Sequence, residues 1–225
     1  MHIAMLIYPR MTQLDMTGPF EVFSSMPNTT IDVVWKDREP VQDLYGLTFV
    51  PNMAFSECPQ TDILFVPGGF GQAALMEDDE VLGFLRKQAE GARYVTSVCT
   101  GSLVLAAAGL LTGYRATSHW AWVDQLALFG AEPVSERVVI DRDRITGAGV
   151  TSGIDFALTL AAELHGEKVA RLIQLSMEYD PAPPFDGGSP KRESPELVSA
   201  LKDRLSGIAE TRIEVAERAA VRLKE

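Results

Sequence analysis

The chain has 225 residues, of which 46% are hydrophobic and 23% are charged, and its formal net charge at pH 7 is −11. A chain of this length and composition can bury one large core, which predicts a single α/β domain over residues 1–225. The negative charge argues against a nucleic-acid or anionic-membrane partner, because either would repel it, so small molecules and proteins are the expected partners.

The first ten residues, MHIAMLIYPR, predict a buried strand rather than a targeting segment. No basic region precedes the short apolar run, no small-residue cleavage site follows it, and no later stretch reaches the roughly 18 apolar residues of a membrane helix. The chain has two cysteines without the Cys-x-x-Cys or Cys/His spacing typical of zinc. We therefore expect a cytoplasmic protein with reduced thiols and no metal.

Apolar runs alternate with helical patterns along the first half of the chain. Four runs are predicted to be buried strands: residues 3–8, 31–35, 62–69 and 93–98. Residues 78–92 have the spacing of an amphipathic helix. Strands that are apolar on both faces suit a parallel sheet with helices on each side, so the pattern predicts a three-layer α/β/α sandwich with a mostly parallel central sheet.

Two shorter segments interrupt this alternation. Residues 41–55 are predicted to form a β-arm, and residues 137–147 are predicted to form a hairpin that turns at residues 141–144. Neither segment is long enough to form a domain of its own.

The last third of the chain is predicted to be helical apart from one loop. Residues 152–166 and 167–179 have helical patterns, whereas the Pro and Gly content of residues 180–190, DPAPPFDGGSP, excludes a helix or strand interior. Residues 194–225 are predicted to form a C-terminal helical extension, because a Ser-Pro-Glu start is typical of a helix N-terminus. We expect this extension to pack on the body of the domain or on a partner subunit.

Cys99 lies where a β-branched run gives way to a small-residue, helix-forming run, in YVTSVCTGSLVLAAAGLL (94–111). This pattern predicts a nucleophile elbow, a sharp turn that presents its central side chain at the C-terminal edge of the sheet. The dipole of the following helix predicts a lowered pKa for the Cys99 thiol. A buried cysteine that acts as a small hydrophobic residue is the alternative. Cys58 has no helix start after it and is expected to be structural.

Two glycines end the strand in FVPGGFG (65–71). Gly68 and Gly69 are expected to leave their backbone N–H groups free to face a ligand. Together with the Thr100 amide they are predicted to form an anion hole for charge that develops on a substrate. A tight turn is the alternative for a Gly-Gly pair taken by itself.

Asp15 follows the first strand in QLDMTGPFEVF (13–23), where Pro19 suits the first turn of a helix. Its ordinary role would be to cap that helix. The end of the first strand lies on the same sheet edge as Cys99, so the carboxyl could instead be kept protonated by the thiolate and act as acid and base. Glu21 is a competing candidate that we expect to be solvated.

His119 lies in RATSHWAWV (115–123), beside Trp120 and Trp122. It is the candidate base if Cys99 belongs to a Cys-His pair. We favour a packed or capping histidine beside the aromatic rings over this catalytic role.

The motifs VPGG and SVCTGSLVLAAAGLL resemble the ThiJ/PfpI family, in the class I glutamine amidotransferase-like superfamily with its flavodoxin-like sandwich. QLDMTGP, ATSHWAW, GAGVTSGIDFALTLAAEL and EYDPAPPFDGGSP are similar to the isocyanide hydratase branch, and the motifs span residues 13–190. The resemblance implies a homodimeric enzyme that hydrates an isocyanide to an N-substituted formamide without metal or cofactor.

The resemblance also implies roles for individual residues. The Cys99 thiolate attacks the terminal carbon of the isocyanide, and Asp15 delivers a proton to give a thioimidate that water then hydrolyses. Thr100 orients Asp15 or the intermediate through its amide or hydroxyl. Three further residues are implied at the substrate: Gly149, Val150 and Trp120.

Two departures separate the chain from other branches of the superfamily. Protease-like relatives place a histidine where this chain has Thr100, and many glyoxalase-type relatives use a Glu where it has Asp15.

About thirty residues follow the Pro-rich loop, too few for the pair of helix-turn-helix modules found in related transcription regulators. The alternatives are a glyoxalase or hydrolase of the same superfamily, or a non-catalytic redox-sensing or ligand-binding module.

Overall fold

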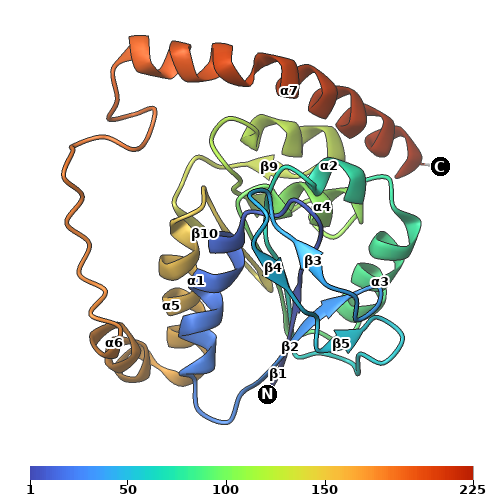
Figure 1. Cartoon of the computed structure of the whole chain (residues 1–225), viewed down its shortest axis with the longest axis vertical. Coiled ribbons are helices and arrows are strands. Elements are labelled where there is room, and N and C mark those ends of the chain that lie inside the picture. Colours follow the sequence, from blue (N-terminus) through green and yellow to red (C-terminus); the bar gives the residue numbers. More distant parts are fainter. Residues whose placement is uncertain (225) are drawn as a thin grey trace.

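A seven-stranded sheet lies at the centre of the computed structural model, which describes residues 1–224 (Figure 1). Neighbouring strands are parallel except β10, which runs antiparallel to β11. The predicted mostly parallel sheet is therefore confirmed. From one edge to the other the strands are β10 (Val138–Asp141), β11 (Arg144–Gly147), β7 (Tyr94–Val98), β6 (Ile63–Val66), β1 (His2–Leu6), β2 (Thr30–Trp35) and β5 (Met53–Ala54).

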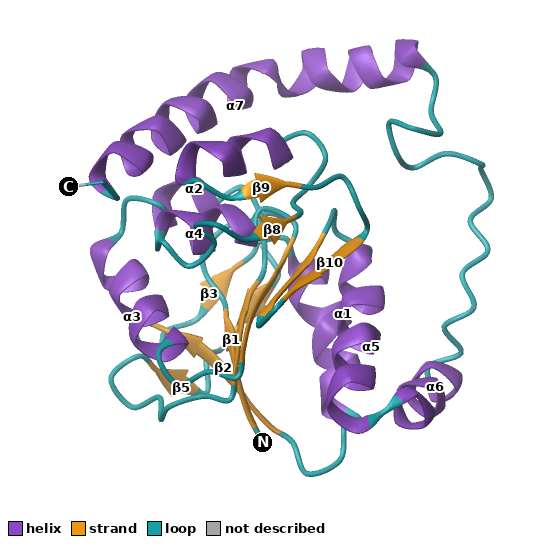
Figure 2. Ribbon diagram, turned by 180° about the vertical axis from the view of Figure 1, so that it is seen from behind, coloured by secondary structure: helices purple, strands orange, loops and turns teal. Residues whose placement is uncertain are grey.

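Helices cover both faces of the sheet, as Figure 2 shows from behind. On one face α1 (Gln13–Ser24) packs on α5 (Ser152–His165), which in turn packs on α6 (Glu167–Ser176). On the other face lie α2 (Gln72–Leu75), α3 (Asp79–Ala89) and α4 (Gly101–Ala107). The predicted three-layer sandwich is confirmed.

The core forms where the central strands meet the helices. All four residues of β6 are buried, in keeping with a strand covered on both faces. Phe23 of α1 packs edge-on against Phe65 of β6 and Phe156 of α5, with ring centroids 6.1 Å apart in each pair. These aromatic contacts tie the α1–α5 layer to the middle of the sheet.

The shorter segments differ in part from the sequence prediction. Within the expected β-arm, β3 (Val41–Gln42) and β4 (Thr48–Phe49) form a small antiparallel pair, but β5 joins the edge of the central sheet beside β2. The hairpin of β10 and β11 turns between Asp141 and Arg144 as predicted, and β11 also extends the sheet by pairing with β7. A second small sheet, β8 (Arg115–Ala116) and β9 (Glu132–Pro133), flanks the 3₁₀ helix η1 (Val123–Phe129).

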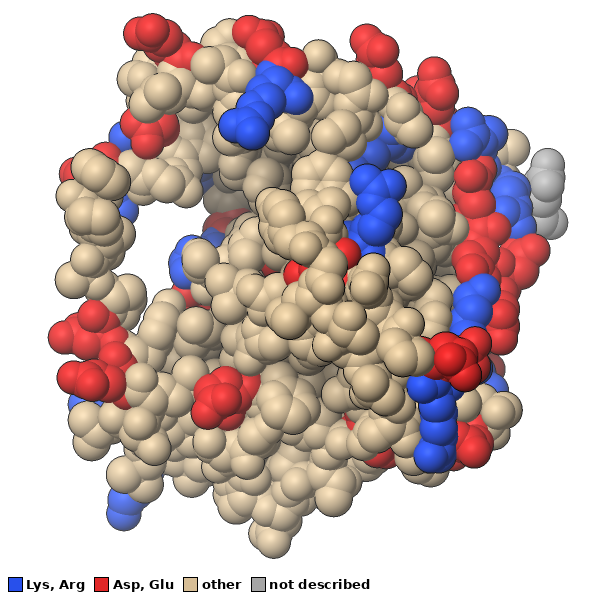
Figure 3. All heavy atoms as spheres, viewed as in Figure 1, with Lys and Arg blue, Asp and Glu red and all other residues tan. Residues whose placement is uncertain are grey.

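The C-terminal helix α7 (Pro195–Arg222) crosses the end of the molecule at which the parallel strands finish (Figure 1). It packs on α2, α4 and η1, and the hydroxyl of Ser194 caps it by accepting from the Leu197 N–H. The preceding segment, residues 178–194, has no regular structure, and Figure 3 shows an opening between it and the body of the molecule. Among residues 1–224, no helix has both the length and the apolar character to cross a membrane.

Candidate active site

The candidate site lies at the point where the strand order reverses. β1 has β2 on one side and β6 on the other, so the connections that leave β1 and β6 diverge and open a crevice at the C-terminal ends of the strands. Three segments that follow β1, β6 and β7 meet there, and they carry Asp15, Gly68 and Cys99.

Cys99 occupies the corner between β7 and α4 with a backbone φ of 56°. This left-handed conformation is uncommon for a residue with a side chain and persists only where the surroundings hold it. The Cys99 N–H donates to the carbonyls of Gly147 and Ala148, at 3.0 and 2.8 Å. The Cys99 carbonyl accepts from the hydroxyls of Ser102 and Ser118, at 3.1 and 2.9 Å. The predicted strand–turn–helix geometry of an elbow around Cys99 is confirmed.

Asp15 is fully buried in the first turn of α1. Its Oδ2 accepts from the Gly68 N–H at 2.9 Å, its Oδ1 has no hydrogen-bond partner among residues 1–224, and the carboxyl faces the Cys99 thiol. The alternative in which Asp15 caps this helix is excluded, because the N-cap is Thr12 and the helix already begins at Gln13. For the same reason Pro19 lies inside α1 rather than in its first turn.

The carboxyl of Asp15 and the thiol of Cys99 perturb one another. Burial raises the pKa of Asp15 to about 7, whereas the hydrogen bonds with Cys99 and the Gly68 N–H act to lower it. The expected direction is therefore confirmed, but the expected cause, the charge of the thiolate, is wrong. Burial also raises the pKa of the Cys99 thiol, and the charge of Asp15 adds to the rise. The predicted lowering is wrong, because α4 has only seven residues and its dipole does not outweigh the loss of water.

These two shifts leave one proton shared by the pair above about pH 7. A thiolate beside a carboxylic acid and a thiol beside a carboxylate carry the same total charge, so they interconvert by a single proton transfer. The backbone N–H groups of Thr100 and Val150 face the sulfur and favour the thiolate. The site can therefore present a nucleophile and an acid at the same moment.

The backbone N–H groups of Gly68 and Gly69 point into the protein. The first donates to Asp15, and the second donates to the Thr100 hydroxyl at 3.0 Å, so the predicted free anion hole is wrong. The Thr100 hydroxyl also donates to the Gly69 carbonyl at 3.3 Å, so it holds the glycine turn rather than Asp15. A Cβ on Gly68 would lie 2.5 Å from the Thr100 nitrogen and 2.8 Å from the Cys99 Cβ. The glycine therefore allows the turn to lie against the nucleophile.

A cavity of about 570 Å³ lies against the segments that hold the Cys99 backbone, although Cys99 itself is not among the residues that line it. Its walls include all three residues that the resemblance places at the substrate, Trp120, Gly149 and Val150. Ser118, which bonds the Cys99 carbonyl, belongs to the same wall, and residues 187–192 close the cavity from outside. A small molecule bound here would lie against Val150, whose backbone N–H faces the Cys99 sulfur.

His119 is a packed, neutral histidine. Burial lowers its pKa to about 4, and the charge of Arg212 acts in the same direction. Its Nδ1 accepts from the Ala121 N–H at 3.3 Å, and its ring stacks on Trp120 with a centroid separation of 5.7 Å. A histidine whose pKa is lowered this far is a weak base near neutral pH, which favours the packing interpretation over the role of base in a Cys-His pair.

The two other candidates lie outside the site. Glu21 is exposed on α1, as expected. Cys58 is half-buried beside Pro59, and burial followed by the charge of Asp32 raises its pKa to about 11. No helix begins directly after Cys58, because the next element is strand β6, in keeping with the expected structural role.

Two buried polar side chains of the site are not marked by any sequence motif. The Tyr8 hydroxyl donates to the Pro67 carbonyl at 2.9 Å, and Arg212 of α7 donates to the Gly69 carbonyl at 3.0 Å. Tyr8 ends an apolar run, and Arg212 is one of several arginines in an amphipathic helix. Nothing in the local pattern separates either of them from its neighbours.

The fold and the site together define an open α/β protein with a cysteine on a nucleophile elbow and a buried carboxyl beside it at the switch point of the sheet. Residues 1–163 match the DJ-1/PfpI family, and the chain belongs to this family. The resemblance found in the motifs is thereby confirmed.

Three relatives illustrate the range of the family. A Pseudomonas putida protein named isonitrile hydratase is 52% identical over 223 residues, which cover 99% of this chain and 98% of that protein. The crystal structure of a ThiJ/PfpI family protein from Pseudomonas syringae superposes with a TM-score of 0.93 at 46% identity, over 96% of this chain and 90% of the other. A Caenorhabditis elegans glutathione-independent glyoxalase is 30% identical over 60% of this chain and 74% of its own.

Proposed function

We propose that this protein is an isocyanide (isonitrile) hydratase, which adds water to R–N≡C to give the formamide R–NH–CHO. Support comes from the 52% identity with the Pseudomonas putida isonitrile hydratase along nearly all of both chains. The observation that carries the chemistry is the buried Asp15 carboxyl beside Cys99, with its pKa raised to about 7. An isocyanide needs both a nucleophile and a proton at one carbon, and this pair supplies both.

In the first step the Cys99 thiolate adds to the terminal carbon of the isocyanide. The same carbon takes the proton of the Asp15 carboxylic acid, so the product is a thioimidate, R–N=CH–S–Cys99, beside an Asp15 carboxylate. The N–H groups of Thr100 and Val150 stabilise the sulfur before the attack. No leaving group departs in this step, which suits a carbon that has none.

In the second step water adds across the C=N bond, with its hydroxyl on carbon and its remaining proton on nitrogen. The resulting R–NH–CH(OH)–S–Cys99 collapses when its hydroxyl proton passes to the Asp15 carboxylate and the C–S bond breaks. The formamide leaves, and the thiolate and carboxylic acid are restored. The substituent R lies in the cavity lined by Trp120, Gly149 and Val150.

The experiment is turnover of a simple aryl isocyanide, followed by loss of isocyanide absorbance and appearance of the formamide. We expect Cys99→Ala to abolish turnover and the matched Cys58→Ala variant to keep most of it, because only Cys99 lies on the elbow. Methylglyoxal is assayed in parallel, since a glyoxalase is among the relatives. Conversion of methylglyoxal without conversion of the isocyanide would favour the glyoxalase alternative.

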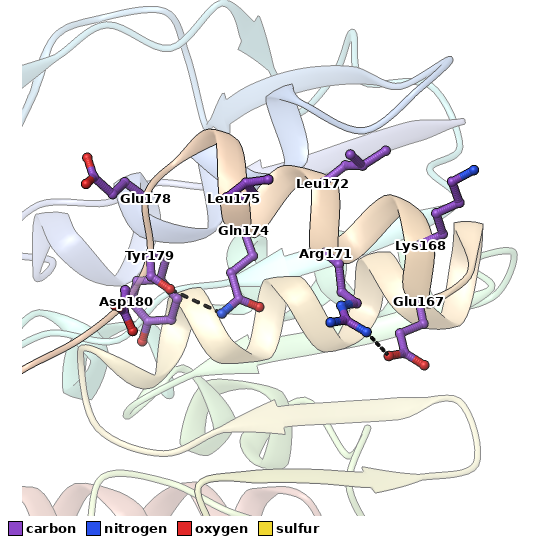
Figure 4. A pocket seen from close by; sticks show the side chains of 9 residues that line it. All are labelled: Glu167, Lys168, Arg171, Leu172, Gln174, Leu175, Glu178, Tyr179 and Asp180. Atoms are coloured by element: carbon purple, nitrogen blue, oxygen red, sulfur yellow. Dashed lines mark hydrogen bonds and ion pairs between the residues drawn. The ribbon is translucent and has the colours of Figure 1, made fainter.

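We also propose that the protein is a cytoplasmic homodimer. Both cysteines are free thiols, in keeping with a reducing compartment. A hollow of about 920 Å³ runs along α6, away from Cys99, and Figure 4 shows Leu172 and Leu175 on the upper side of α6 and the Arg171–Glu167 ion pair on its lower side in that view. Leu175 is 77% exposed and Phe185, in the segment that borders the opening of Figure 3, is 83% exposed.

A second copy of the chain is the occupant that we propose for the hollow along α6, because Leu172 and Leu175 line it together and neighbouring exposed apolar side chains mark protein–protein interfaces. Solution scattering at micromolar concentration measures the mass directly. We expect the dimer mass for the parent protein and a larger monomer fraction for Leu175→Glu. A monomeric parent protein would contradict the proposal.

A further inference from the structure

The C-terminal helix places one charged side chain inside the candidate site. Arg212 is only 4% exposed, although the rest of its helix borders solvent along much of its length. Its Nη2 donates to the Gly69 carbonyl at 3.0 Å, and its guanidinium lies over the rings of Trp122 and Phe70, 4.6 and 5.1 Å from their centroids. A side chain from the last helix of the chain therefore contacts the glycine turn beside Cys99.

Arg212 has no carboxylate at ion-pair distance among residues 1–224. The next two arginines along the helix differ, because Arg218 pairs with Glu77 and Arg222 pairs with Asp79. A buried cation is unfavourable unless other groups balance it. Cys99 and Tyr8 are the groups whose negatively charged forms act favourably on Arg212, and Asp15 lies beside Cys99.

The hydrogen bond of Arg212 also connects it to the acid. Arg212 donates to the Gly69 carbonyl, and the Gly69 N–H donates to the Thr100 hydroxyl. The N–H of the adjoining Gly68 donates to the Asp15 carboxyl. Displacement of the Gly69 carbonyl would thus move the backbone that fixes Asp15. One side chain of α7 acts on both members of the pair, on Asp15 through the backbone and on Cys99 through charge.

We propose that Arg212 is a positioning residue for the Cys99–Asp15 pair: its guanidinium fixes the glycine turn that holds Asp15, and its positive charge favours the anionic form of the pair. The proposal concerns the reactivity of Cys99 toward any electrophile and does not depend on which substrate the enzyme uses.

The other titratable groups around the pair do not supply this charge. Burial lowers the pKa of His119 to about 4, so its ring is neutral near pH 7. Burial and the charge of Asp15 raise the pKa of Tyr8, so its hydroxyl is neutral as well. Arg10, the remaining cation near Arg212, is exposed, and solvent screens it. Arg212 is the buried cation among these groups.

The test measures the alkylation rate of Cys99 by iodoacetamide as a function of pH, in a Cys58→Ala background so that one thiol reports. Arg212→Met removes the charge at similar volume, Arg212→Lys keeps it, and Arg218→Met is the matched control on the same helix. We expect Arg212→Met to raise the pH midpoint of alkylation by about one unit, as for loss of a neighbouring opposite charge. Arg212→Lys and Arg218→Met should stay close to the parent midpoint.

An unchanged midpoint in folded Arg212→Met, or an equal shift in Arg218→Met, would overturn the proposal, because α7 would then act only by packing. If Arg212→Met does not fold, Arg212→Gln takes its place as the neutral variant. Turnover of the aryl isocyanide adds a second readout, in which we expect kcat to fall at least tenfold for the neutral variant with KM little changed. Since alkylation needs no isocyanide, failure of this proposal is distinguishable from failure of the proposed activity.

Discussion

Replacement of Asp15 by Asn tests the buried carboxyl through the stability of the fold. The pKa of Asp15 is raised from 3.8 to about 7 in the folded protein, mainly because the side chain is removed from water. Between these two pH values the folded protein binds more protons than the unfolded chain. Stability therefore falls as pH rises through this range, and Asp15→Asn has no proton to lose.

The size of the effect follows from the shift. One pKa unit corresponds to about 1.36 kcal/mol, so a rise of about three units corresponds to about 4 kcal/mol. Below about pH 4 the Asp15 carboxyl is neutral in both states and this contribution is fully present. By about pH 8 it is lost, and the parent protein should have lost about 4 kcal/mol more of its unfolding free energy than Asp15→Asn.

The assay is urea denaturation of the parent protein, Asp15→Asn and the control Asp180→Asn at several pH values between about 4 and 8, under reducing conditions. Asp180 is exposed, so its replacement should leave the pH dependence of the parent protein unchanged. Differences between variants cancel the titration of all other groups. Parallel curves for the parent protein and Asp15→Asn would refute the argument, because the carboxyl would then titrate alike in the folded and unfolded states.

Three further predictions concern activity. Asp15→Asn should lower kcat for an aryl isocyanide at least about a hundredfold, which is the usual contribution of a general acid. Near-parental turnover by the folded variant would show that another group donates the proton to the isocyanide carbon. In the parent protein kcat/KM should rise as pH increases through about 7, because Asp15 and Cys99 are both protonated below that pH and share one proton above it. A level profile of kcat/KM from about pH 6 to 8 would exclude the shared proton. Gly68→Ala should lower activity at least tenfold, because its Cβ would lie 2.7 Å from the Asp15 Oδ2. The control Gly83→Ala on α3 should keep activity, because no atom lies within 4 Å of the added carbon. Equal activity of the two variants would show that the glycine turn tolerates displacement.

The parts of the site that were predictable from sequence are those set by local pattern and sheet geometry. A β-branched run followed by small helix-forming residues placed Cys99 on an elbow, and the parallel strands brought the end of β1, with Asp15, to the same edge. Both inferences need only neighbouring residues and the rule that parallel strands finish on one side.

The parts that were not predictable depend on packing between distant segments. Burial of the Cys99 thiol, which reverses its expected pKa shift, results from contacts that no single motif contains. The inward direction of the Gly68 and Gly69 amides depends on acceptors from α1 and from Thr100. Arg212 contacts a carbonyl 143 residues earlier in the chain, and its spacing in the helix is that of an ordinary polar position.

The docking of α7 also fixes the order in which the site can be completed during synthesis. Every strand of the sheet, the elbow and the acid precede α7 in the chain, so they leave the ribosome before the arginine that contacts the glycine turn. Until α7 arrives, the surfaces of α4 and η1 that it covers face water, and four residues of its apolar face, Val215, Ala216, Ala219 and Ala220, have no place to pack. The elbow and Asp15 are thus made before the helix whose arginine contacts the glycine turn, and the packing of α7 on α4 and η1 closes this part of the interior after them.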